Sequence, residues 1–184
     1  MAKVRDNPLP VKIFVGMVSN DSALFEEVGA KLEEVLGPSD LRSPVWNWDH
    51  TSYYLKEMGG DLKRHFIFFK RLVDPGIMPD LKLKTIEIEN MYLNENGGRK
   101  INLDPGYLDS ARVLLVSGKD FSHRVYIGKG IYGEVTLVYS GNDFQVLPYT
   151  YPDFKFKEYQ DLFKKARKLY QSEMERLKGG LTRS

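Results

Sequence analysis

The chain has 184 residues, of which 42% are hydrophobic and 28% are charged. This composition is typical of one folded globular domain and excludes a disordered chain. The net charge is only +2 and the lysines are interspersed with acidic residues, so no nucleic-acid partner is indicated. The absence of cysteine excludes disulfides, thiolate metal sites and cysteine nucleophiles, and it predicts a cytoplasmic protein.

The N-terminal segment predicts a buried strand followed by a helix. Residues 11–19 (VKIFVGMVS) are too short an apolar run for a signal peptide and are followed by helix-capping residues. Helical spacing of Leu24, Val28, Leu32 and Val35 predicts a helix that ends at the Gly-Pro pair 37–38. No stretch approaches the roughly 18 consecutive apolar residues of a transmembrane helix, so we expect no membrane association.

The middle of the chain predicts alternating strands and helices. Residues 43–60 indicate a strand and then a short helix, 64–73 a strand, 79–93 a helix behind a proline, and 99–104 a strand. Residues 106–118 are ambiguous, because ARVLLVS is strand-like whereas Leu108, Ala111 and Leu115 keep a helical period. We prefer the helix there and keep the strand as the alternative.

The C-terminal third predicts three antiparallel strands within 123–149 and then an amphipathic helix. The apolar stripe of that helix consists of Phe156, Tyr159, Phe163, Ala166, Leu169, Tyr170 and Leu177. The expected fold is therefore a single α+β domain over residues 1–184. Its core spans about 11–178, with a mixed, mostly antiparallel sheet, packed helices and a flexible tail at 179–184.

A glycine pattern at residues 128–135 imitates a phosphate-binding loop. Gly128, Gly130, Gly133 and Val135 match G-x-G-x-x-G-x-V, but the β-branched residues after Gly133 do not open a helix. The residues that a protein kinase requires downstream are also missing. We therefore expect a β-hairpin with a three-residue loop, in which Gly130 takes a positive φ.

Strand alternation in this hairpin predicts two different faces. It pairs Tyr126 with Tyr132 and Arg124 with Glu134. The expected core face holds Val125, Ile127, Ile131, Val135, Leu137, Tyr139, Phe144 and Val146. The expected polar and aromatic face holds Arg124, Tyr126, Tyr132, Glu134, Thr136 and Gln145. The second face is either an ordinary solvated surface or the wall of a ligand site.

Two further groups of polar residues are candidates for a site. Alternation places Asn102 and Asp104 on the same face of their strand, although Asp-Pro-Gly is also common in turns. The three histidines, His50, His65 and His123, lack the spacing of a helical zinc pair. His123 is the strongest candidate among them because it lies next to Arg124.

Several blocks of the chain resemble a prokaryotic family filed as a domain of unknown function, the 4416 series. The blocks are WDHTSYYLKEMG, LKRHFIFFKRLVDPG, RKINLDPGYLDSARVLL, KDFSHRVYIGKGIYGEVTLVY and LPYTYPDF. Some members carry a GTP-binding label, but this chain contains no P-loop and no base-reading Asn-Lys-x-Asp sequence. The resemblance implies site residues within these blocks: Tyr54, Arg64, Lys82, Asn102, Asp104, Lys119, His123, Arg124, Tyr126 and Glu134.

Two classes of function remain open on the sequence. In the first, an enzyme acts on a phosphorylated or otherwise anionic small molecule, and the candidate catalytic residues are Asp104, Glu134 and His123, with a carboxylate as base or as ligand of a magnesium cofactor. Its ligand-binding residues are then Tyr54, Arg64, Lys82, Asn102, Lys119, Arg124 and Tyr126. In the second, a module binds a nucleotide or single strand by stacking, without turnover. A structural interaction protein is a third option, and the sequence does not indicate the oligomeric state.

Overall fold

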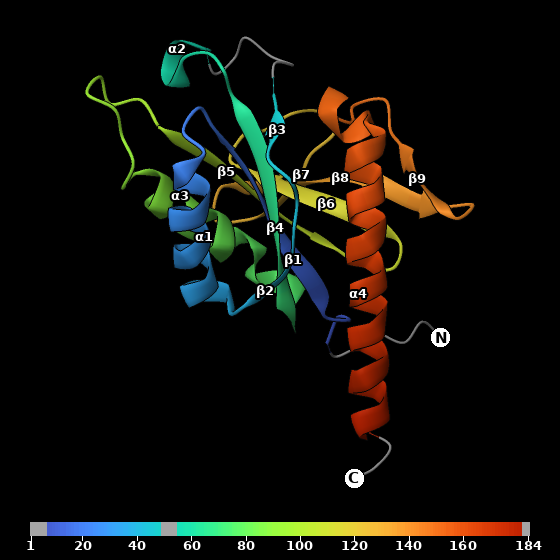
Figure 1. The fold of residues 1–184 in the computed structure, drawn as a ribbon. Coiled ribbons are helices and arrows are strands. Elements are labelled where there is room, and N and C mark those ends of the chain that lie inside the picture. Colours follow the sequence, from blue (N-terminus) through green and yellow to red (C-terminus); the bar gives the residue numbers. More distant parts are fainter. Residues whose placement is uncertain (1–6, 49–54, 182–184) are drawn as a thin grey trace.

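The structure is a computed structural model that describes residues 7–48 and 55–181 (Figure 1). The elements of the N-terminal half are β1 (Val11–Ser19), α1 (Ala23–Leu36), β2 (Ser39–Arg42), β3 (Trp46–Asn47), α2 (Leu55–Met58), β4 (Lys63–Val73), η1 (Pro75–Ile77) and α3 (Met78–Glu89). The remaining elements are β5 (Ile101–Leu108), β6 (Arg112–Ser117), β7 (Val125–Gly128), β8 (Ile131–Ser140), β9 (Asp143–Val146), η2 (Pro152–Lys155) and α4 (Lys157–Leu181). The α+β prediction is confirmed. In the part of the chain that the structure describes, no helix is long and apolar enough to cross a membrane.

The described strands form one nine-stranded sheet. Its order is β2-β4-β1-β5-β6-β8-β7, while β3 pairs with β4 and β9 pairs with β8. Every ladder found among the described residues is antiparallel. Strand β2, which follows directly after the Gly-Pro pair at the end of α1, was not among the predicted elements.

Helices cover both faces of this sheet (Figure 1). On one face, Ile13, Val15 and Met17 of β1 pack against apolar side chains of α1 and α3. On the other face, Phe14 of β1 packs with Phe163 and other apolar side chains of α4. Because β1 lies between two helical layers, all nine of its residues are buried, including the polar ones.

The sheet opens between β5 and β6, and this opening makes room for the site. Their ladder pairs only Gly106, Tyr107 and Leu108 with Leu115, Leu114 and Val113. Nearer the start of β5, side chains of α3 bond the strand backbone instead: Lys82 Nζ donates to the carbonyl of Leu103 at 2.8 Å, and Glu89 Oε1 accepts from its N–H at 2.6 Å. Helix α3 thus satisfies the backbone of β5 where no strand does.

The preferred helix at 106–118 is wrong, because these residues form the end of β5, a turn and β6. A Cβ at Gly106 would lie 2.4 Å from the Leu114 carbonyl oxygen and 2.5 Å from Phe14, so the two strands can approach only at a glycine. Asp109 accepts backbone hydrogen bonds from Ala111 and Arg112, which closes the turn. Tertiary pairing therefore overrides the local helical period.

The glycine-rich segment is a hairpin turn, as predicted, but its loop is shorter than expected. Gly128 pairs with Ile131, so only Lys129 and Gly130 form the loop. Their φ values are 55° and 76°, as in a type I′ turn. The predicted partners Tyr126 and Tyr132 do face each other.

The expected single core face of the C-terminal strands is wrong. Opposite β6, the register skips Thr136: Leu114 pairs with Val135, but Val113 pairs with Leu137. This bulge reverses the alternation, so Ile131 packs on the α1 side and Leu137 on the α4 side. On the edge strand β7, Val125 and Ile127 are exposed, as is Val146 of β9. Glu134 and Thr136, which the pattern placed on a solvated or ligand-facing wall, are buried.

Candidate functional site

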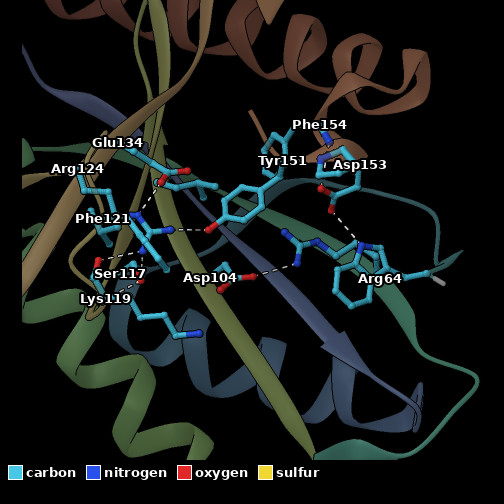
Figure 2. A pocket seen from close by; sticks show the side chains of 14 residues that line it. Arg64, Asp104, Ser117, Lys119, Phe121, Arg124, Glu134, Tyr151, Asp153 and Phe154 are labelled. Atoms are coloured by element: carbon cyan, nitrogen blue, oxygen red, sulfur yellow. Dashed lines mark hydrogen bonds and ion pairs between the residues drawn. The ribbon is translucent and has the colours of Figure 1, made fainter. Parts of the chain in front are cut away.

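A cavity of about 420 Å³ lies on the α4 side of the sheet, where β5 and β6 diverge. Strands β4, β5, β6 and β8 line it together with the segment after β6 and the η2 turn. Figure 2 shows Arg64 and Arg124 on opposite sides of this cavity, with Asp104 and Tyr151 between them. The lining residues are Trp48, Arg64, Asp104, Leu115, Val116, Ser117, Lys119, Phe121, Arg124, Glu134, Tyr151, Pro152, Asp153 and Phe154.

Arg64 forms one side of the cavity, where Gly16 leaves room for its side chain and Asp104 pairs with its guanidinium. Its side chain is only 3% exposed and crosses β1 above Gly16, where a Cβ would lie 2.6 Å from Nη2. Nη1 donates to Asp104 Oδ2 at 3.0 Å, and the guanidinium lies over the Phe66 ring at 4.6 Å. Nε is buried and has no hydrogen-bond partner among the described residues. Gly16 is therefore the position that lets the arginine reach Asp104.

The protonation states of Arg64 and Asp104 are set by burial and by the neighbouring charged groups. Burial raises the pKa of Asp104, but the positive charges of Arg64 and Lys82 outweigh it, so the pKa lies below its usual value. Burial lowers the pKa of Arg64, whereas Asp104 and Asp153 outweigh this and raise it above its usual value. Both groups are therefore charged at neutral pH. The Asp104 side chain is 32% exposed, so part of its carboxylate faces the cavity.

The opposite side is a hydrogen-bonded cluster around Arg124. Its Nε donates to Glu134 Oε2 at 2.7 Å, and Nη1 donates to Ser117 Oγ at 3.2 Å and to the Lys119 carbonyl at 2.9 Å. Nη2 donates to the Tyr151 hydroxyl at 2.6 Å. All three nitrogens are thus engaged within the protein, and the predicted cross-strand pair of Arg124 and Glu134 is a buried ion pair.

His123 extends this cluster beyond the residues that line the cavity. Its Nε2 lies 3.0 Å from Glu134 Oε2, and its ring stacks on Tyr149 with centroids 4.5 Å apart. Glu134 Oε2 therefore has two partners, whereas its Oε1 is buried with none among the described residues. His123 does not itself line the cavity.

Aromatic side chains from the chain segments around the sheet complete the cavity. Trp48 Nε1 donates to Asp153 Oδ2 at 3.0 Å, which ties the end of the β3 segment to the η2 turn. The Phe121 ring lies 4.9 Å from the Arg124 guanidinium carbon. Burial, and then the negative charge of Glu134, raise the pKa of Tyr151, so its phenol stays protonated. The walls therefore combine four aromatic side chains with charged groups at two opposite sides.

Five of the ten predicted site residues line this one cavity: Arg64, Asp104, Lys119, Arg124 and Glu134. Four others do not. Lys82 and Asn102 lie beside the start of β5, where Asn102 Oδ1 accepts from Arg99 Nη1 at 2.8 Å, and His123 and Tyr126 lie near β7. The Tyr126 ring packs edge to face on Tyr132. Tyr54 lies outside the described residues.

Sequence reasoning missed the aromatic half of the cavity, namely Trp48, Phe121, Tyr151 and Phe154, as well as the supporting Gly16. All four aromatic residues fall inside the blocks WDHTSYYLKEMG, KDFSHRVYIGKGIYGEVTLVY and LPYTYPDF, but no periodicity singles any of them out. Only their place in the fold brings them together.

The residues present do not fit a metal ion. Asp104 is paired with Arg64, and Glu134 is paired with Arg124 and His123. No group of three or more histidine, aspartate or glutamate residues suited to a metal occurs in the described ranges 7–48 and 55–181. The structure therefore provides no support for magnesium at the two carboxylates.

Fold and site together define a single α+β domain with a polar and aromatic cavity on one face of an open antiparallel sheet. A family model described as "Domain of unknown function (DUF4416)" matches residues 9–170, and the chain belongs to this family. The resemblance drawn from the sequence blocks is thereby confirmed. No curated protein and no solved structure matches the chain significantly.

Proposed function

We propose that the protein binds a small molecule carrying a carboxylate or phosphate group in this cavity, and that Arg64 recognises the anion. The observation that carries the proposal is a buried guanidinium with an unused donor. Nη1 is bonded to Asp104, but Nε has no partner among the described residues. An unsatisfied buried donor costs about 1–3 kcal/mol, and a ligand oxygen would remove that cost.

Anion binding in this cavity would rely on hydrogen bonds to the ligand and not on long-range electrostatic attraction. The charged lining residues are three cations and three anions: Arg64, Lys119, Arg124, Asp104, Glu134 and Asp153. Their charges cancel, so the cavity does not concentrate anions from a distance. Selectivity for an anion must then come from hydrogen bonds made inside the cavity, which the Arg64 side chain lines.

The size and the walls of the cavity indicate a compact ligand with a flat part. Pockets for small molecules usually measure about 300–1,000 Å³ and combine apolar walls with a few polar groups. This cavity, at about 420 Å³, is near the lower end. Rings of Phe121, Tyr151 and Phe154 line it, and a planar group can pack against them.

Catalysis on the same ligand is the second candidate. One observation favours it: Asp104 is an ionised carboxylate, partly exposed, in the cavity that holds the anion donor. A general base must lie within hydrogen-bond reach of the proton that it removes. Recovery of a bound ligand unchanged after long incubation, measured by NMR, would favour binding over catalysis.

The experiment is a thermal-shift titration with inorganic phosphate, adenosine 5′-monophosphate and benzoate. A probe at about 100 times its Kd should raise Tm by roughly 5–10 °C for a domain of this size. Arg64→Lys keeps the charge beside Asp104 but removes the Nε edge, so it should abolish the rise. Its Tm without probe shows whether it folds.

Arg112→Lys is the matched control, because Arg112 pairs with Asp109 at an exposed turn outside the cavity. This variant should keep the full shift. The proposal would be wrong if none of the three probes stabilised the wild type, or if a folded Arg64→Lys variant kept the wild-type shift.

A further inference from the structure

The two sides of the cavity carry unused groups of opposite polarity. Arg64 is 3% exposed and Glu134 is 2% exposed, and each keeps one buried polar atom without a partner among the described residues: Nε, a donor, and Oε1, an acceptor. Figure 2 shows the two side chains on opposite sides of the cavity, with Tyr151 between them. The residues that line this one cavity thus include an unsatisfied donor on one side and an unsatisfied acceptor on the other.

Glu134 cannot rotate to satisfy its free oxygen. Its Oε2 accepts from Arg124 Nε at 2.7 Å and lies 3.0 Å from His123 Nε2, so the carboxylate is anchored by two neighbours. Arg124 is itself anchored by Ser117, the Lys119 carbonyl and Tyr151. This network fixes the position of Oε1 and leaves it as an acceptor that only an N–H or O–H donor can satisfy.

We propose that the ligand is a planar molecule with an amino or ring N–H group at one end, which donates to Glu134 Oε1, and an anionic group at the other, which accepts from Arg64. The flat part packs between Phe121, Tyr151 and Phe154. This inference rests on the proposed function and specifies the class of ligand for the same cavity. Glu134 thereby acts as a specificity-determining residue.

The test compares pairs of probes that differ only at the donor position. Adenosine 5′-monophosphate and purine riboside 5′-monophosphate differ only by the amino group on one ring carbon. 4-Aminobenzoate and benzoate differ by an amino group alone. Calorimetric titration of the full chain should give a Kd about tenfold or more lower for the amino member of at least one pair, since a hydrogen bond to a charged group contributes that much.

Glu134→Gln sharpens the comparison. The amide oxygen can still accept from Arg124 and His123, which places the amide NH₂ where Oε1 was. The preference for the amino probe should then be lost or inverted. Should this variant fail to fold, as its Tm would reveal, the wild-type pairs decide the question alone.

The outcomes distinguish a failure of this inference from a failure of the proposed function. Equal Kd values within both pairs would overturn this inference, as would a folded Glu134→Gln variant with an unchanged preference. The proposed function would survive either result if the binding still depended on Arg64. Absence of binding for all four probes would overturn both.

Discussion

Individual residues in the central strands determine where the buried charged side chains of this protein can lie. Gly16 lacks the Cβ that would collide with Arg64, and this allows the guanidinium to lie across the central strand. Lys12 is fully buried, yet its ammonium group donates to Asp40 and to the Phe69 carbonyl. Buried charges with complete partners are tolerated. The exceptions at Arg64 and Glu134 are therefore informative about function.

His65 should make stability depend on pH. The ring is buried against Phe25, its Nδ1 lies 3.2 Å from Ser43 Oγ, and its Nε2 has no partner among the described residues. Burial lowers the pKa of His65 below its ordinary 6.5, and the positive charge of Arg42 adds to this, while the Pro44 carbonyl, the Ser43 backbone and the negative charge of Glu26 act against it. Below pH 6.5 the unfolded chain binds the proton more readily than the folded protein does.

The free energy of unfolding should therefore be undiminished above pH 6.5 and should fall as the pH drops from 6.5 toward the folded pKa. The slope in that window is up to about 1.4 kcal/mol per pH unit. Urea unfolding of the wild type and of His65→Gln between pH 5 and 8 measures it. Identical slopes for the two proteins below pH 6.5 would show that His65 is not responsible.

At the scale of elements, irregularities in the sheet create the cavity. The bulge at Thr136 places Leu137 and Glu134 on the same face, so one strand supplies both the α4 core and the cavity wall. The opening between β5 and β6 leaves space beside Asp104 because Lys82 and Glu89 bond the Leu103 backbone. A regular ladder would close this space.

Gly130, the second loop residue of the hairpin between β7 and β8, should matter for stability and not for ligand binding. Gly130 has φ 76°, so Gly130→Val should cost about 1–2 kcal/mol, because β-branched side chains clash in the left-handed region. Lys129→Ala is the control: its ion pair with Asp80 is exposed, and such pairs contribute little. Denaturant midpoints measure both variants.

The loop does not line the cavity, so both variants should bind the phosphate and carboxylate probes as the wild type does. A nucleotide affinity that disappears in Lys129→Ala while the fold is retained would contradict the turn interpretation and restore the phosphate-loop hypothesis.

At the scale of the whole molecule, α4 lies over the aromatic part of one face of the sheet (Figure 1). Phe163 packs against Phe14, Phe66 and Phe68, with ring centroids 5.0–5.7 Å apart. The same layer begins beside the cavity, where Phe154 of η2 is both core and lining. Folding of the α4 layer and assembly of the site are therefore coupled.

Removal of residues 154–184 should give insoluble protein, because it exposes the aromatic face of β1 and β4. Removal of residues 177–184 is the control, since residues 177–179 are exposed. The shorter truncation should keep a cooperative melt. Soluble expression and calorimetry compare the two, and a cooperative melt of the longer truncation would refute the assigned role of α4.

Local sequence patterns were sufficient to predict most of the helices and strands. The amphipathic C-terminal helix was predictable because its apolar spacing keeps one period over many residues. The strand at 11–19 followed from its short apolar run, and the helix Met78–Glu89, expected over 79–93, followed from its length and the proline at its start. Cross-strand partners such as Tyr126 with Tyr132 followed from the turn glycines. Turn and period are short-range properties, so the sequence encodes them within a few neighbouring residues.

The sequence by itself therefore determined the α+β class, most elements and five of the charged residues that line the cavity. Only the tertiary structure decided that Arg64, Asp104 and Glu134 share a cavity, that 106–118 is a strand pair, and that Trp48, Tyr151 and Phe154 enclose the space. The physical reason is that strand pairing, the bulge in β8 and the approach at Gly106 depend on contacts between segments far apart in the chain. Local hydrophobic periodicity carries no information about such contacts.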